Sequence, residues 1–108
     1  MNINVGDMLY ITLKKKDYTL TRLAEELTKQ QEILGYKGTI LKSNLSAKFT
    51  IRDGEAGVTP ELARRIEIIL DLPKYSLVDM CPKRSREAKS QIARVKRVDE
   101  LLGKKEDI

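Results

Sequence analysis

Histidine and tryptophan are absent from this chain of 108 residues, and cysteine and phenylalanine occur once each. Without histidine the chain lacks the commonest general base and metal ligand, and Cys81 has no second thiol with which to form a disulfide or a zinc site. No glycine motif of the kind that cradles phosphate is present. We therefore expect neither an enzyme nor a bound metal or cofactor. A lone thiol is typical of reducing compartments, which suggests the cytoplasm.

Long apolar runs and aromatic residues are also scarce. No stretch approaches the length of a membrane span, and no cationic-then-apolar leader is visible, so we expect no membrane association. A hydrophobic content of 41% in 108 residues suffices for one modest core. Of the aromatic residues, only Tyr36 and Phe49 flank the central basic positions. These are too few for a stacking platform that would bind single-stranded nucleic acid.

Positive charge is concentrated near the C-terminal end. The chain has 21 Lys and Arg against 16 Asp and Glu, a formal charge of +5. Residues 1–81 hold 12 basic and 11 acidic side chains, whereas residues 82–108 hold 9 and 5. From Lys83 to Arg97 there are seven cations and a single anion, Glu87. Such a cluster attracts polyanions, although it is also typical of a solvated helix face.

Helix start signals recur along the chain and predict an all-α fold. Asn4 is placed to cap a first helix that ends in the lysines of residues 14–16, which suit the negative end of its dipole. Thr19 is placed to cap a second helix. At a later signal Thr59 precedes Pro60, which fits the first helical position because its missing N–H would have no partner there.

The helix that starts at Thr59 is expected to be amphipathic and to run to about residue 70. Its predicted apolar stripe consists of Leu62, Ile66, Ile69 and Leu70. Arg64 and Arg65 lie outside this stripe, so we expect both side chains in solvent.

A break and two further helices are expected after residue 70. Leu72-Pro73 ends the preceding helix, and Ser76 is placed to cap a short helix that runs through Met80. Pro82 indicates a boundary. Beyond it five apolar residues recur at spacings of 4, 3, 3 and 4, namely Ala88, Ile92, Val95, Val98 and Leu102. This pattern predicts one long amphipathic helix that packs on its own domain or on a partner copy.

Two segments carry a resemblance to a known family. LTRLAEEL (20–27) and SNLSAKF (43–49), followed by TPELARRIEIIL (59–70), resemble the helix-turn-helix domains of the Cro and lambda-repressor (XRE-like) family. In that family a small residue lies where two helices cross, here Ala24, and an apolar residue packs back onto it, here Leu45. The resemblance covers roughly residues 4–80. It implies a lambda-repressor-like domain of about five helices, with residues 41–50 as the helix that enters the major groove.

The chain departs from this family between the two helices. Leu27 and Leu45 are separated by 18 positions, whereas the family spacing is about 7, so residues 28–39 resemble an insertion of about 11 residues. The apolar stripe continues to Leu34 if the first of the two helices runs on for two more turns, with Gly35 as its stop. The insertion could equally fold as a short arm.

The resemblance implies a sequence-specific regulator of transcription, a repressor that binds double-stranded DNA as a homodimer with half-sites about one turn apart. The implied DNA-binding residues are Lys42, Ser43, Asn44, Ser46, Ala47, Lys48, Thr50 and Arg52. Asn44 suits adenine, and the lysines suit guanine or phosphate. Asn44 and Ser43 have an alternative role in capping the N-terminus of the helix, and Arg52 has one in a surface ion pair.

These observations predict a division of the chain into two parts and leave two alternative functions open. Residues 1–81 would form the helix-turn-helix domain, and residues 82–108 a basic helical extension. The main alternative function is a protein-interaction module, resembling antitoxins, in which the extension docks a protein partner. Nonspecific binding of nucleic acid through the basic extension is the third possibility.

Overall fold

A computed structural model describes residues 4–50 and 57–103, and within these ranges every regular element is a helix. The helices are α1 (Val5–Lys15), α2 (Leu20–Leu34), α3 (Lys42–Thr50), α4 (Pro60–Leu70), the short 3-10 helix η1 (Val78–Met80), α5 (Lys83–Glu87) and α6 (Lys89–Leu102). The predicted all-α class is therefore confirmed for the described residues. None of these helices is long and apolar enough to cross a membrane.

The predicted start signals act as helix caps. The side chain of Asn4 accepts a hydrogen bond from the backbone N–H of Asp7 at 2.8 Å, and Thr19 accepts one from Arg22 at 3.1 Å. Thr59 likewise caps α4, with Pro60 in the first turn. Each such cap satisfies a backbone donor that has no partner within the helix, and its loss costs about 1 kcal/mol.

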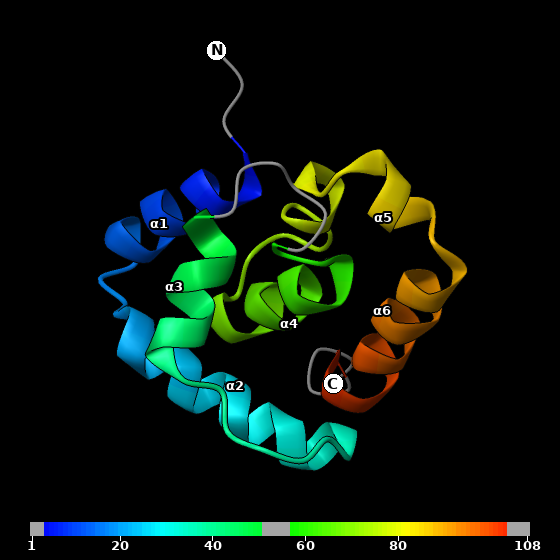
Figure 1. Cartoon of the computed structure of the whole chain (residues 1–108), viewed down its shortest axis with the longest axis horizontal. Helices are drawn as coiled ribbons and strands as arrows, with labels where there is room; N and C mark the ends of the chain where they lie inside the picture. Colours follow the sequence, from blue (N-terminus) through cyan, green and yellow to red (C-terminus); the bar gives the residue numbers. More distant parts are fainter. Residues whose placement is uncertain (1–3, 51–56, 104–108) are drawn as a thin grey trace.

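The helices surround α4, which lies between α1 and α3 on one side and α6 on the other (Figure 1). α2 runs along a third edge and contacts α3, α4 and α6. The main core draws on α1 to α4 and on the segment that follows α4. Its residues that are fully shielded from solvent include Leu9, Leu23, Leu27, Ala63 and Ile66. α6 packs along α4, so the C-terminal extension covers a face of the helical body.

Two predictions for the C-terminal part were wrong in detail. The expected long helix is divided at Ala88, whose extended backbone (φ −63°, ψ 127°) separates α5 from α6. Neither Pro nor Gly marks this break. The break allows α6 to lie along α4 while α5 stays beside Cys81, whose carbonyl accepts from Arg86 Nε at 2.9 Å. The short helix before it begins at Val78 rather than next to Ser76, and it has no side-chain cap of its own.

Candidate nucleic-acid interface

α3 separates its apolar residues from its polar ones. Leu45 and Phe49 are each 1% exposed and face the core. The residues predicted to contact DNA that are exposed are Lys42, Ser43, Asn44, Ala47, Lys48 and Thr50. Ser46 is partly exposed, and Arg52 lies outside the described residues. The helix thus presents two cations and several short polar groups on one continuous surface, which matches the size and chemistry of a major-groove contact.

Close packing on α1 fixes the C-terminal end of α3. Gly6, in the first turn of α1, lies so near the end of α3 that a Cβ atom at this position would be 2.0 Å from the Phe49 carbonyl oxygen. The rings of Tyr10 and Phe49 meet edge to face, with centroids 5.4 Å apart. Because these are backbone and ring contacts rather than flexible side chains, they set the position of α3 tightly.

The N-terminal end of α3 is fixed by one of the predicted contact residues. Asn44 Oδ1 accepts a hydrogen bond from the backbone N–H of Leu41 at 3.2 Å, the reach-back half of a capping box. Asn44 therefore has the predicted alternative role of a helix cap. The Asn44 side chain is exposed, and its amide NH₂ takes no part in this hydrogen bond. At the other end the Thr50 hydroxyl donates to the carbonyls of Ser46 and Ala47.

The inserted segment closes on itself next to α3. Of the two alternatives for this segment, the structure shows the longer helix: α2 continues to Leu34 and ends at Gly35, which adopts the left-handed conformation (φ 80°). The chain then returns, and the Ile40 N–H donates to Thr28 Oγ1 at 3.0 Å. The Thr28 hydroxyl also lies 3.3 Å from the Ile40 carbonyl. Residues 29–39 are thus an excursion that leaves and re-enters at one place, which is how α3 can pack on α2 despite the long connection.

The excursion points away from α3 and toward the C-terminal extension (Figure 1). Leu34 from the insertion forms a second hydrophobic cluster with Val98 and Leu102 of α6, flanked by Tyr36 and Ile68. The hydroxyl of Tyr36 donates to a carboxylate oxygen of Glu61 in α4. Residues 28–39 and the C-terminal extension therefore pack against each other.

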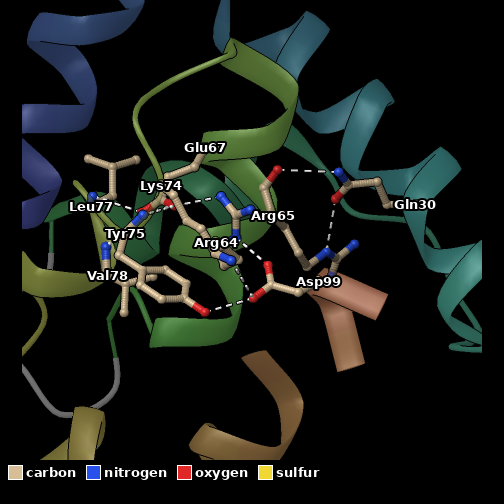
Figure 2. Close-up of polar contacts among 9 residues, drawn as sticks. All are labelled: Gln30, Arg64, Arg65, Glu67, Lys74, Tyr75, Leu77, Val78 and Asp99. Atoms are coloured by element: carbon tan, nitrogen blue, oxygen red, sulfur yellow. Dashed lines mark hydrogen bonds and ion pairs between the residues drawn. The ribbon is translucent and has the colours of Figure 1, made fainter. Parts of the chain in front are cut away.

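A buried polar network joins α4 to α6 (Figure 2). Arg64 is 2% exposed, and its guanidinium donates to Asp99 of α6 and, at 3.0 Å, to Glu67. Tyr75 donates to the other oxygen of Asp99 at 2.7 Å. The prediction that Arg64 lies in solvent was wrong because helix α6 covers it, a long-range contact that the spacing within α4 does not reveal.

Arg65 was also predicted to lie in solvent and is instead 4% exposed. Figure 2 shows that it bridges α4 to α2. Its guanidinium donates to Gln30 Oε1 at 3.0 Å and to the Leu27 carbonyl at 2.8 Å, while the Gln30 amide donates to the Arg65 carbonyl at 3.2 Å. Burial lowers the pKa of Arg65. Gln30 and the Leu27 carbonyl, both neutral, thus accept hydrogen bonds from the buried Arg65 guanidinium, and these bonds hold α4 against α2.

Glu67 supplies the cap that the short helix η1 lacks. Its side chain is fully buried, and its two carboxylate oxygens accept from the backbone N–H groups of Tyr75, Leu77 and Val78 at 2.7 to 2.9 Å. Because Arg64 also donates to Glu67, this carboxylate joins the short helix to the network between α4 and α6.

Cys81 is a free, buried cysteine. Burial raises the pKa of Cys81 to about 12, so its thiol is protonated and unreactive near neutral pH. Across residues 4–50 and 57–103, no group of three or more Cys, Asp or Glu side chains is arranged to hold a metal ion. The exposed surface of α3 carries six of the eight residues that the sequence predicts to contact DNA.

Comparison with known proteins gave no match: no family model fits the chain, and neither a curated protein nor a solved structure is similar to it.

Proposed function

We propose that this protein is a sequence-specific regulator that binds double-stranded DNA by inserting α3 into the major groove. The observation that supports the proposal is the division of α3 into a buried apolar side and an exposed side with Lys42, Asn44 and Lys48. The packing of α3 on α1 and α2, together with an insertion directed away from it, supports a lambda-repressor-like arrangement. Such a fold leaves the recognition surface free to enter a groove about 12 Å wide.

The proposal includes dimeric binding and repression. α3 has nine residues, so one copy can contact only a few base pairs. Two copies on half-sites about one helical turn apart would double the contact area and give a palindromic site. A bound dimer would exclude other proteins from the same stretch of DNA, which is the simplest way for a protein of this size to repress transcription.

Selection of binding sites from random duplex DNA with the full chain tests the proposal. We expect a motif with two related half-sites. Asn44→Ala and Asn44→Asp separate two roles of this residue, because aspartate keeps the acceptor for the Leu41 N–H and removes the amide donor. Both variants should lose the adenine preference, while Asn44→Asp keeps the stability of the wild type.

Charge contacts are tested by the salt dependence of affinity. Lys48→Ala should reduce the slope of log K against log salt by about 0.9 if this lysine neutralises one phosphate. Lys89→Ala, an exposed lysine of α6, is the matched control and should leave both motif and slope unchanged. Absence of any enriched motif at low salt from folded protein, or a motif unaffected by the Asn44 variants, would refute the assignment of α3.

Point variants are preferable to removal of the extension in these experiments. A chain that ends at Cys81 would leave buried Arg64 without Asp99 and would uncover Leu34. Loss of binding in such a truncated chain would report unfolding as readily as a lost contact.

A further inference from the structure

An apolar groove lies beside α6 on the side that the core does not cover. Of the apolar stripe on α6, Val95, Val98 and Leu102 are buried, whereas Ile92 is 52% exposed. The groove has a volume of about 370 Å³ and is lined by Pro60, Tyr75, Val78, Arg86, Gln91, Ile92, Val95 and Lys96. An aliphatic floor of this kind is a poor surface to leave in water, and exposed apolar clusters with polar rims mark interaction sites.

The walls of this groove come from four elements that are fixed relative to one another. Pro60 begins α4, Val78 begins η1 and Arg86 belongs to α5. Tyr75 lies in the loop between α4 and η1, and the other lining residues, Gln91, Ile92, Val95 and Lys96, come from α6. Arg86 is held in place because its Nε donates to the Cys81 carbonyl at 2.9 Å. The groove is therefore preformed, and a ligand would not have to order it on binding.

The rim of the groove is positively charged. Arg86 and Lys96 line it, and Lys89 lies on the exposed surface of the same helix as Lys96. No carboxylate is among the lining residues. Both charged residues that line the groove are therefore cations, which disfavours pairing with an identical groove of a second copy and favours a ligand that carries negative charge.

The chemistry of the floor favours a protein over a nucleic acid. Aliphatic side chains such as Ile92 and Val95 suit a bulky apolar side chain, whereas bases bind proteins by stacking on aromatic rings. The one ring in the groove is already engaged, because the Tyr75 hydroxyl donates to Asp99 and the charged groups of Arg64 and Lys74 lie 5.4 and 5.2 Å from its ring centroid.

We propose that this groove docks an acidic segment of a partner protein. A bulky apolar side chain of the segment rests on Ile92 and Val95, and neighbouring carboxylates pair with Arg86 and Lys96. The groove is lined in part by α5 and α6, and these helices lie across α4 from α3 (Figure 1). The docked segment therefore does not occupy the candidate DNA surface. This inference stands on its own and does not depend on the function proposed for α3.

Selection from a displayed library of random 12-residue peptides, with the full chain as target, tests the proposal. We expect enriched peptides that combine Asp or Glu with Leu, Ile, Phe or Met. Their affinity should fall by about tenfold or more in Ile92→Ser and in Lys96→Glu, the effect typical of a central contact. Ile33→Ser and Lys48→Glu are matched controls at exposed positions on other surfaces, and both should bind the peptides as the wild type does.

Three results would overturn the proposal. The first is a library without enriched acidic peptides, and the second is a set of peptides whose binding is the same in Ile92→Ser. The third is evidence that the groove binds something else. This would be a DNA oligonucleotide whose binding depends on Lys96 and not on Ile92, or self-association of the protein in sedimentation that Ile92→Ser abolishes. Circular dichroism and thermal melts of each variant establish that it is folded. Loss of DNA binding in α3 variants would leave peptide binding unchanged, so the two proposals fail separately.

Discussion

Replacing Gly6 by alanine should push α1 away from α3 and destabilise the protein. The added Cβ would lie 2.0 Å from the Phe49 carbonyl oxygen and 2.9 Å from its carbonyl carbon, both backbone atoms that cannot rotate aside. Contacts below 3.0 Å are essentially never seen for a Cβ atom, so the helices must separate by about 1 Å at this point. That shift would loosen the packing of Val5, Leu9 and Phe49, which are buried.

The magnitude follows from two opposing effects. Overpacking of a well-filled core costs about 1 to 3 kcal/mol, and we expect the upper end because the clash is with backbone. Alanine is favoured over glycine in a helix by about 1 kcal/mol, which acts in the other direction. The free energy of unfolding should therefore fall by about 2 kcal/mol. Because Gly6 contacts the end of α3, the same variant should also weaken DNA binding.

Urea denaturation followed by circular dichroism measures the change, and the chain provides a matched control. Gly103 has no atom within 4 Å of an added Cβ, so Gly103→Ala should change the free energy of unfolding by less than about 0.5 kcal/mol. A Gly6→Ala variant as stable as the wild type, or more stable, would show that the added Cβ meets no backbone atom. The close approach of α1 and α3 would then be refuted.

Two further predictions concern the C-terminal part. Asp99→Ala should lower the free energy of unfolding by about 2 kcal/mol because it leaves the buried Arg64 cation with fewer partners. Lys74→Ala, which removes an exposed group 4.0 Å from the same carboxylate, should cost less than about 0.5 kcal/mol, and equal losses in denaturation would contradict this reasoning. Burial raises the pKa of Cys81 from 9.0 to about 12, so stability tied to this thiol is complete below the unfolded-state pKa and is lost as pH rises toward the folded value. Wild-type stability should therefore fall more steeply than that of Cys81→Ala between about pH 9 and 11, by up to about 1.4 kcal/mol per unit, and parallel curves in pH-dependent denaturation would count against it.

Features that depend on neighbouring residues were predicted well. The caps at Asn4, Thr19 and Thr59 and the stop at Gly35 are all present, because each is a hydrogen bond or a backbone conformation within one turn. The outward residues of α3 followed from the family resemblance, in which Leu45 packs back onto the preceding helix, whereas the burial of Phe49 was not predicted. Whether that surface binds DNA stays a prediction.

Features that depend on distant residues were not predictable in the same way. Nothing in the spacing of α4 distinguishes an exposed arginine from one covered by another helix, so the burial of Arg64 and Arg65 required knowledge of α6 and α2. The cap of η1 comes from Glu67, several residues earlier in the chain, rather than from Ser76 beside it. The division of the last helix at Ala88 follows from where α5 and α6 pack.

The sequence by itself determined where most of the helices begin and end, because 3.6-residue periodicity and capping are local. Only the tertiary structure decided where the insertion and the extension pack. Leu34 and Val98 are separated by 64 positions in the chain, yet they share one cluster. Such contacts depend on how all the helices share a single buried volume, and no local pattern records that arrangement.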